Sequence, residues 1–397
     1  DVISWSALIS GYVQHGEGSA ALNCFEQMKS EGFAPDAITF ISVLKACGMT
    51  GAINKAKQIH NEIVGRGFLG KHTMLGTAVV NMYAKCGDFN KAWEVHEDFG
   101  IQNVASWSAL ISGYQQHGQA DLALTCFEQM QDEGLSPDAI TFICALKACS
   151  ITGAIDKGQY IHAEIQRQGL LEGDSIIGSA LVDMYVKCSL LADAEKMFDK
   201  LPFRDVVSWT ALITGLVDHG CAEEAISCVA QMQCKSIPLN ATTFVCSLKA
   251  CGIAGDKDIA LMIHVEVEKK GLAREILVGN SLIDTYIKCG LLESAEKVFN
   301  NLAVKDVISW TAMISAYAQH RQGHEALNCF QRMESEGFAP NVVTFICILM
   351  ACGSTGAIEK GHQIHEKIVS GGFLEKDVMV GAALVDMYAK CGMFAKA

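Results

Sequence analysis

The stretch DVISWSALISGYVQHGEGSAALNCFEQMKSEGFAPDAITF, residues 1–40, decides the fold of this chain. Its first apolar residues fall at the spacing i, i+3, i+4 and i+7 that predicts one face of a helix: Trp5, Leu8, Ile9 and Tyr12. His15 and Gly16 end this helix, and a second apolar stripe with the same period follows: Ala21, Cys24, Phe25 and Met28. A turn from Gly32 to Pro35 closes the unit. Neither helix can bury its stripe alone, so we expect neighbouring units to stack around a continuous core.

The unit is repeated along the whole chain, and tryptophan marks a longer period of 101 or 102 residues. The phrases at these tryptophans are DVISWSALISGY, NVASWSALISGY, DVVSWTALITGL and DVISWTAMISAY. Each period holds an opening, a middle and a short repeat. The opening repeats span 1–35, 103–137, 205–239 and 306–340; the middle repeats span 36–70, 138–172, 240–273 and 341–375; the short repeats span 71–102, 173–204 and 274–305, with an incomplete one at 376–397. Strand-like alternation is missing, so the sequence predicts a single all-α array over 1–397.

The composition agrees with a chain that folds over its whole length. Apolar residues make up 50%, and the chain has only five prolines and no Pro-rich or Gly/Ser-rich linker. No apolar run reaches the roughly 18 to 20 residues that span a bilayer, so we expect no membrane partner. The net charge of −13 opposes nucleic-acid binding unless cations gather locally. Because the chain starts at Asp1 and its last repeat is incomplete, we interpret it as a fragment.

The 17 cysteines recur in step with the repeat. One set follows alanine in the middle repeats: Cys47, Cys149, Cys251 and Cys352. Another set follows lysine in the short repeats: Cys86, Cys188, Cys289 and Cys391. A residue placed once per repeat at one structural position is expected to be a small buried side chain rather than a ligand or half of a disulfide. A reducing compartment follows from this interpretation.

The first helix of each repeat has a second, largely polar face. At 100° per residue, the residues opposite the core stripe are Ile3, Ser6, Ser10 and Gln14. One position of this face holds Ser6, Ser108, Thr210 and Thr311 in the opening repeats and Thr77, Ser179, Asn280 and Ala382 in the short repeats. We expect these side chains to be exposed. Variation at a fixed exposed position is typical of a surface that recognises a ligand.

A row of lysines follows the same face. It consists of Lys45, Lys147 and Lys249 in the middle repeats and Lys85, Lys187, Lys288 and Lys390 in the short repeats. Such a row can contact phosphates, and it is equally typical of a solvated helix surface. On this pattern alone, both interpretations stay open.

With these residues in hand, the chain resembles the pentatricopeptide repeat family, in its plant organellar class of alternating P, L and S motifs. A P motif is similar to SWSALISGYVQHGEGSAALNCFEQMKSEGFAPD, an L motif to TFISVLKACGMTGAINKAKQIHNEIVGRGF, and an S motif to LGTAVVNMYAKCGDFNKAWEVHEDF. The opening, middle and short repeats then correspond to P, L and S repeats in that order along the whole chain. The resemblance implies a right-handed superhelical α-solenoid of helix-turn-helix repeats.

The resemblance also implies binding of single-stranded RNA, with about one nucleotide per repeat and each base chosen by two side chains. These are the fifth and the last residue of a repeat when the count starts at the first residue of its first helix, such as Val2, which is one or two residues after the boundaries given above. The implied pairs are Ser6 with Asp36, Thr77 with Asn103, Ser108 with Asp138, Ser179 with Asp205, Thr210 with Asn240, Asn280 with Asp306, and Thr311 with Asn341. An Asp carboxylate only accepts hydrogen bonds, which suits G or U, whereas an Asn amide donates and accepts, which suits A or C. In family usage Ser and Thr favour purines and Asn favours pyrimidines, so the implied RNA, 5′ to 3′, is G, any, A, G, any, G, A, any, U, A, any.

The last-position residues have a simpler interpretation as well. Each stands directly before a predicted helix, where Asp and Asn are preferred N-caps for local reasons. Capping alone would explain their presence, although one side chain can fill both roles.

Further site residues follow from the resemblance. The second residue of a repeat would separate neighbouring bases as an apolar wedge: Ile3, Ile38, Met74, Ile140, Ile176, Val207, Leu277, Ile308 and Val343. Ala105 and Thr242 are weak wedges. In the L repeats the fifth residue cannot hydrogen-bond a base, so we expect spacers with little selectivity: Ile41, Ile143, Val245 and Ile346. The lysine row would contact phosphates.

Catalytic motifs do not emerge from the sequence. The H-x-E half of a zinc deaminase signature occurs at His60, His162 and His264, but the required P-C-x-x-C is missing and these histidines recur with the L repeats. We therefore expect packing or surface roles for them, and no enzyme activity, metal or cofactor. The resemblance implies that a full-length parent could carry a C-terminal deaminase-like DYW domain.

Two functions compete. The resemblance implies organellar transcript processing in mitochondrion or chloroplast, as site recognition for C-to-U RNA editing, with other RNA-editing factors as partners and no small-molecule substrate. The alternative is a protein-binding scaffold like the tetratricopeptide repeats, whose period of about 34 residues is similar. These repeats lack the W-x2-L-G-x2-Y pattern of that family, which favours RNA.

Overall fold

The computed structural model describes residues 1–69, 72–98, 101–171, 175–394 and 396. These residues form α-helices joined by short turns, with no strand among them, so the all-α prediction is confirmed. None of the described helices combines the length and apolar character needed to cross a membrane. The expected repeat boundaries at 70/71 and 172/173, and the last residue at 397, lie outside the described residues.

The chain divides into two compact blocks, Asp1–Leu212 and Ile213–Ala397, which we describe separately. In the N-terminal block the first helices of the repeats are α1 (Val2–Gln14), α3 (Ala37–Thr50), α5 (Thr73–Lys85), α7 (Val104–Gln116), α9 (Ala139–Thr152) and α11 (Ser175–Lys187). The second helices are α2 (Gly18–Ser30), α4 (Ile53–Gly65), α6 (Phe89–Asp98), α8 (Ala120–Asp132), α10 (Ile155–Arg167) and α12 (Leu191–Lys200). The boundary between the blocks falls within α13 (Val206–Asp218).

The C-terminal block has the same alternation. Its first helices are α15 (Ala241–Ala254), α17 (Ile276–Lys288), α19 (Val307–Gln319), α21 (Val342–Thr355) and α24 (Val378–Lys390). Its second helices are α14 (Ala222–Cys234), α16 (Lys257–Lys269), α18 (Leu292–Asn301), α20 (Gly323–Ser335) and α22 (Ile358–Ser370). Two short elements precede first helices, namely the 3-10 helix η1 (Leu272–Arg274) and α23 (Phe373–Lys376).

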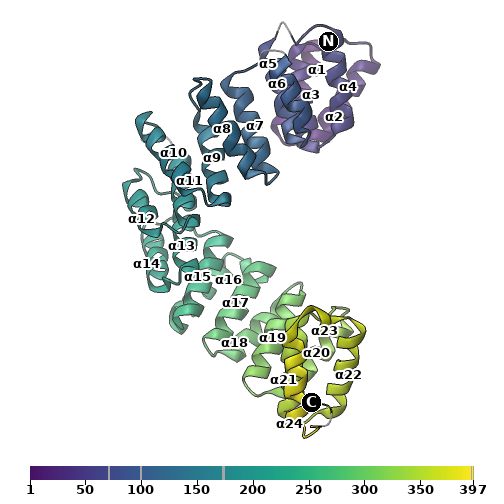
Figure 1. Cartoon of the computed structure of the whole chain (residues 1–397), viewed down its shortest axis with the longest axis vertical. Coiled ribbons are helices and arrows are strands. Elements are labelled where there is room, and N and C mark those ends of the chain that lie inside the picture. Colours follow the sequence, from purple (N-terminus) through teal and green to yellow (C-terminus); the bar gives the residue numbers. More distant parts are fainter. Residues whose placement is uncertain (70–71, 99–100, 172–174, 395, 397) are drawn as a thin grey trace. The chain divides into compact units, whose positions relative to one another are not determined.

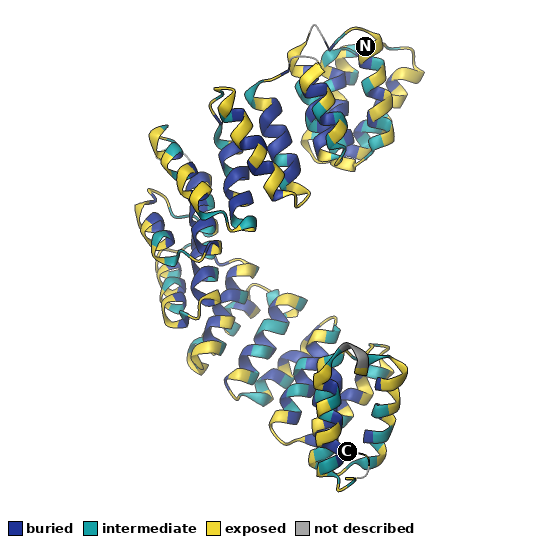
Figure 2. Cartoon of the chain, viewed as in Figure 1, coloured by how far each residue is buried: buried dark blue, intermediate teal, exposed yellow. Residues whose placement is uncertain are grey.

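Within each block, the first helices of successive repeats pack side by side and the second helices cover them (Figure 1). For example, α3 lies between α1 and α5 and also contacts α2 and α4. Buried residues gather along the first helices, while the second helices keep one exposed side (Figure 2). This is the all-α helical repeat solenoid that the stacked amphipathic stripes predict.

The fourth residue of the first helix sets how each repeat fills this core. The opening and middle repeats, which we label P and L repeats, place tryptophan and phenylalanine there, as in Trp107 and Phe142, which are at most 2% exposed. S repeats place glycine, and a Cβ atom on Gly178 would lie 2.3 Å from Cδ2 of Leu201. An aliphatic side chain near the end of the S repeat, such as Leu201, therefore lies against this glycine.

The first repeat departs from the expected stripe. Ile9 is fully buried, but Leu8 is 47% exposed, whereas its counterpart Leu110 in the second P repeat is 0% exposed. Leu110 belongs to α7, which is covered by α5 on one side, while α1 packs only against elements that follow it. In this chain Leu8 is therefore exposed, although its counterpart in the second P repeat is a core residue.

Most of the cysteines that recur with the repeat are buried as expected, whereas Cys86 and Cys391 are half-buried. The thiol Sγ of Cys86 lies 3.7 Å from the backbone oxygen of Cys47, and the same contact recurs between the S and L repeats of the later periods. Burial raises the pKa of Cys47 to about 12, so this thiol stays protonated at neutral pH and behaves as a small hydrophobic side chain. All the cysteines are free thiols in the described part of the chain.

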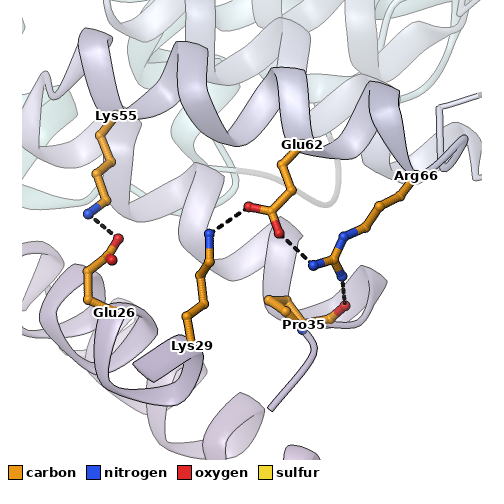
Figure 3. Close-up of polar contacts among 6 residues, drawn as sticks. All are labelled: Glu26, Lys29, Pro35, Lys55, Glu62 and Arg66. Carbon is orange, nitrogen blue, oxygen red and sulfur yellow. Dashed lines mark hydrogen bonds and ion pairs between the residues drawn. The ribbon is translucent and has the colours of Figure 1, made fainter. Parts of the chain in front are cut away.

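Ion pairs connect neighbouring second helices at their exposed side (Figure 3). Lys55 of α4 pairs with Glu26 of α2, and Nζ of Lys29 lies 2.8 Å from Oε2 of Glu62. Arg66 donates to Oε1 of the same Glu62 at 2.6 Å and to a backbone carbonyl of the turn after α2. These long side chains link α2 to α4.

The fourth period carries the same pair with its charges exchanged. Glu334 and Lys367 stand where the first period has Lys29 and Glu62, and they also form an ion pair. The third period has Gln233 and Glu266 at these positions, and Nε2 of Gln233 donates to Oε2 of Glu266 at 3.0 Å. The contact between neighbouring second helices therefore recurs with different donors and acceptors.

Candidate nucleic-acid interface

The last residue of each repeat caps the first helix of the next repeat. Oδ1 of Asp36 accepts a hydrogen bond from the backbone N–H of Thr39 at 2.8 Å. The same bond, at 2.8 to 3.0 Å, recurs at Asn103, Asp138, Asp205, Asn240, Asp306 and Asn341. A side-chain oxygen here satisfies an N–H group of the first turn that has no partner inside the helix. The capping role expected from the sequence is confirmed.

The fifth-position side chains are more deeply buried than the sequence suggests. The hydroxyl residues Ser6, Ser108, Ser179 and Thr311 are only 3 to 8% exposed, so the expectation of exposure is wrong for them. For Ser6, Ser108 and Thr311, the first helix that carries the residue packs against the first helix of the next repeat. Thr77, Thr210 and Asn280 are half-buried, and Ala382 is exposed.

At the P-to-L junctions, a third side chain joins the expected pair. Oγ1 of Thr39 lies 2.6 Å from Oγ of Ser6 and donates to Oδ1 of Asp36 at 2.6 Å. Equivalent contacts link Ser108, Thr141 and Asp138 in the second period, and Thr311, Thr344 and Asn341 in the fourth. Thr39, Thr141 and Thr344 are completely buried.

At the S-to-P junctions, the fifth and last residues meet directly. Ser179 donates from Oγ to Oδ1 of Asp205 at 3.1 Å. Nδ2 of Asn103 donates to Oγ1 of Thr77 at 3.3 Å. Nδ2 of Asn280 lies 3.2 Å from Oδ1 of Asp306. The structure thus brings together the members of these pairs, which lie 26 residues apart in the chain.

The two members of the expected pair Thr210 and Asn240 belong to different blocks. Thr210 belongs to the N-terminal block, where its hydroxyl donates to the carbonyl of Val206 at 2.6 Å. Asn240 belongs to the C-terminal block, where it caps α15 through Thr243. Each residue is placed as expected within its own block.

Capping uses one of the two polar atoms of each last-position side chain. Within the described residues, Oδ2 of Asp36, Asp138 and Asp205 accepts no hydrogen bond, and Nδ2 of Asn341 donates none. Burial opposes ionisation of Asp36, but hydrogen bonds from Thr39 and Ser6 outweigh it and lower the pKa of the carboxyl below its usual value. The atom that remains is therefore a pure acceptor on Asp36 and a pure donor on Asn341.

The second-position side chains are apolar and exposed. Their exposed fractions run from 53 to 77%: Ile3, Ile38, Met74, Ile140, Ile176, Val207, Leu277, Ile308 and Val343. Ala105 and Thr242 are exposed too, but they offer little apolar surface. This regular series of exposed aliphatic side chains lies outside the core and is a candidate binding surface.

A hollow of about 300 Å³ shows how these residues come together. It lies in the N-terminal block, where an L, an S and a P repeat meet, and its walls include Ser179, Asp205, Ile176, Val207, Ile143 and Lys147. One polar pair, two wedges and a lysine therefore surround a single space. Ile143, expected to be part of a spacer, forms a wall of the site of the next repeat.

The lysine row is exposed along its whole length: Lys45, Lys85, Lys147, Lys187, Lys249, Lys288 and Lys390. Three S-repeat lysines, however, pair with an aspartate four residues earlier, as Nζ of Lys187 does with Asp183 at 2.8 Å. The first S repeat has Asn81 at that place, so Lys85 has no such acidic neighbour. The i, i+4 spacing was visible in the sequence, but it was not recognised as a source of neutralisation.

The histidines of the H-x-E phrases serve packing. Nδ1 of His60 lies 2.9 Å from the hydroxyl of Tyr83 in the next S repeat, and His162 and His264 make the same contact. Burial lowers the pKa of His60, although Glu94 acts against this, and Lys91 lowers it further. Among the described residues, no group of three or more His, Cys, Asp or Glu is arranged to hold a metal ion.

The bridging threonines are functional candidates that the sequence analysis missed. The third residue of every L repeat is threonine: Thr39, Thr141, Thr243 and Thr344. This constancy within the repeats DAITF, NATTF and NVVTF was a usable signal. Its meaning depends on a contact with a residue 33 positions earlier, which only the stacked helices reveal.

Stacked helix pairs with capped junctions and an exposed apolar series define a helical repeat solenoid. A model of the PPR repeat family matches residues 1–49, 102–150, 204–252 and 305–354, and a PPR repeat model matches 38–68, 77–99, 179–206 and 280–307. This chain belongs to the pentatricopeptide repeat family.

Relatives in Arabidopsis thaliana cover the whole chain. Pentatricopeptide repeat-containing protein At2g39620 is 34% identical over 100% of this chain and 47% of its own length. At1g11290, chloroplastic, and At2g03380, mitochondrial, are each 32% identical over 99% of this chain, and the matches cover 48% and 56% of those proteins. The chain spans about half the length of these relatives.

The fold is also similar to a solved structure, that of maize PPR10 in complex with an 18-nt psaJ RNA element. The TM-score is 0.56 with 16% sequence identity, over 99% of this chain and 72% of that one. At this identity, the likeness concerns the fold.

Proposed function

We propose that this chain binds single-stranded RNA in a sequence-specific way, with about one nucleotide per repeat and the 5′ end at the N-terminal repeats. The observation that carries the proposal is the series of exposed second-position aliphatic side chains beside capped polar pairs. Bases have flat apolar faces and polar edges. An aliphatic wedge next to a hydrogen-bonding pair complements both, and stacking contacts suit any base.

The capping geometry supports a simple rule for base choice. Asp36, Asp138 and Asp205 keep Oδ2 as an acceptor, which fits the N–H groups on the Watson–Crick edges of G and U. Asn341 keeps Nδ2 as a donor, which fits the ring nitrogen acceptors of A and C. This narrows the expectation from the sequence, in which the Asn amide both donates and accepts.

The repeats are proposed to follow the boundaries given in the sequence analysis, with P, L and S repeats in turn. The preferred RNA is then G, any, A, G, any, G, A, any, U, A, any, from 5′ to 3′. RNA binding gains support from the maize protein of the same fold that was solved with an RNA element. Relatives named chloroplastic and mitochondrial support an organellar location, where site recognition for C-to-U editing is the role that we propose.

Selection from a randomised single-stranded RNA pool tests the proposal. We expect enrichment of the stated pattern, with least preference at the L repeats. A matched variant, Ile38→Ser with Ile140→Ser, should lose affinity without unfolding, because these side chains are 64% and 61% exposed. If the pool shows no enrichment, the protein-scaffold alternative is favoured. If the wedge variant binds as well as the parent chain, the RNA does not run along this face.

A further inference from the structure

The third residue of the first helix differs between junctions in what its hydroxyl contacts. In the first, second and fourth L repeats it is a buried threonine whose Oγ1 contacts both members of the base-recognition pair, as Thr344 does with Thr311 and Asn341. In the second, third and fourth P repeats it is a serine whose hydroxyl turns to the backbone, as Ser309 does with the carbonyl of Asp306 at 2.9 Å. The two kinds of junction therefore hold the fifth-position side chain differently.

This arrangement determines which hydroxyl donates a hydrogen bond and which accepts it. Oδ1 of Asn341 is a carbonyl oxygen, which only accepts, so the hydroxyl of Thr344 must donate to it across 2.9 Å. With its single hydrogen committed, Thr344 can take part in the 2.7 Å contact with Thr311 only as an acceptor. The hydroxyl of Thr311 must then be the donor, and it keeps only lone pairs for any other partner.

The Ser108 hydroxyl is also committed where the last residue is aspartate. Oδ1 of Asp138 lies 2.6 Å from Oγ1 of Thr141 and 3.2 Å from Oγ of Ser108, and a carboxylate only accepts. The Ser108 hydroxyl hydrogen therefore goes to Thr141 or to Asp138 and leaves only lone pairs toward a base. The Thr77–Asn103 junction is opposite. There Asn103 donates to Oγ1 of Thr77 at 3.3 Å, which leaves the Thr77 hydroxyl hydrogen unassigned.

We propose that the third-position threonines of the L repeats, Thr141 and Thr344, are positioning residues for base recognition by the preceding P repeat. Each one locks the fifth-position hydroxyl as an acceptor toward the base and also holds the last-position side chain. P repeats thus use three side chains, and S repeats use two. This inference rests on the proposed RNA binding and adds a residue class to its recognition rule.

The test measures discrimination rather than affinity alone. Thr344→Val keeps the shape of the buried side chain and removes its hydroxyl, while Thr344→Ser keeps the hydroxyl. Affinities are compared for RNAs with A or G at the tenth base. Because one neutral hydrogen bond is involved, we expect Thr344→Val to lower the A-over-G preference by about three- to tenfold and Thr344→Ser to preserve it. Thr141→Val should have the same effect on the G-over-A preference at the fourth base.

A matched control comes from the other kind of junction. Ser309→Ala removes a hydroxyl that bonds only to the backbone at Asp306, so the preference at the ninth base, assigned to Asn280 and Asp306, should not change. Full discrimination in both valine variants, with unchanged melting temperatures, would overturn the inference. A parent chain without any preference at the fourth and tenth bases would instead refute the proposed recognition itself. The second valine site keeps the test decisive if Thr344→Val fails to fold.

Discussion

Oδ1 of Asn341 accepts the backbone N–H of Thr344 at 2.8 Å, so this amide caps α21 with its oxygen and keeps its nitrogen for other partners. Asn341→Asp replaces that donor with an acceptor and leaves the cap in place. Preference at the tenth base should then move from A toward G, by about 1 to 3 kcal/mol if the contact resembles other good base-edge pairs. RNA selection with the variant measures this shift.

Capping and base recognition can be separated by a control on a second helix. Asp256 caps α16 by accepting from the backbone N–H of Ile259 at 3.0 Å, away from the first helices. Asp256→Asn should therefore leave the selected RNA unchanged. Because Asp and Asn are comparable N-caps, both variants should melt near the temperature of the parent. If Asn341→Asp still selects A, its side chain is only a cap.

The aspartates beside the S-repeat lysines should limit RNA affinity. Asp183 and Asp284 pair with Lys187 and Lys288 at 2.8 Å, so they offset the positive charge of the lysine row. Asp183→Asn and Asp284→Asn should each strengthen binding to all sequences and steepen the dependence of log K on log salt by up to about 0.7. Asn81→Asp beside Lys85 should have the opposite effect. Titrations at several salt concentrations measure these slopes.

The control for these charge changes lies on the other layer. Asp132 is exposed near the end of α8, a second helix, and Asp132→Asn makes the same change in net charge away from the lysine row. It should alter the salt slope little, because exposed charges farther apart than a Debye length of about 10 Å are largely screened at 0.1 M salt. An equal increase in slope for Asp132→Asn would move the RNA path away from the first helices.

Much of the fold and part of the site could be predicted from the sequence. The 3.6-residue period revealed both helices of each repeat, and Asp or Asn before an apolar phrase revealed the caps. The burial of Ser6 could not be predicted in the same way, because a helical wheel assigns one core face. A first helix such as α3 is flanked by a helix on either side and covered by second helices, so its polar side is also partly enclosed.

The proposed role of Thr344 could not be predicted from the sequence for a related reason. Its importance depends on which hydroxyl donates and which accepts, and that depends on the approach of Thr311 from 33 residues earlier. By contrast, the Lys187–Asp183 ion pair is local, and its i, i+4 spacing can be seen in the sequence. Local hydrogen bonds and ion pairs are thus predictable in this chain. Which of two hydroxyl groups from neighbouring repeats donates to the other is not predictable.

Stability should fall as the pH drops from about 7.5 to about 5.5, because buried histidines resist protonation. Burial lowers the pKa values of His60, His162 and His264 in the folded chain below the 6.5 of an unfolded chain. The unfolded state therefore binds more protons below that pH, and stability is lost from about pH 6.5 down to the folded pKa values. Melting temperatures across this range measure the effect.

Among these three histidines, His60 should contribute most to this loss. Its Nε2 is buried and has no hydrogen-bond partner in the described part of the chain, whereas Nε2 of His264 lies 3.5 Å from Glu268, which can stabilise a protonated ring. His60→Asn should therefore flatten the pH dependence more than His264→Asn does. A larger effect of His264→Asn would contradict this assignment.

Gly113→Ala should destabilise the chain although alanine is the better helix former. A Cβ atom on Gly113 would lie 2.7 Å from Cβ of Ala84 and 3.1 Å from its backbone oxygen, so α5 and α7 would have to move apart. Overpacking of this kind costs about 1 to 3 kcal/mol, against a gain in helix propensity of about 1 kcal/mol.

Gly11 occupies the equivalent position of α1, and nothing lies within 4 Å of a Cβ atom there. Gly11→Ala should therefore stabilise the chain by up to about 1 kcal/mol. Denaturant unfolding of both variants measures the two signs, and stabilisation by Gly113→Ala would show that the contact between α5 and α7 yields at little cost.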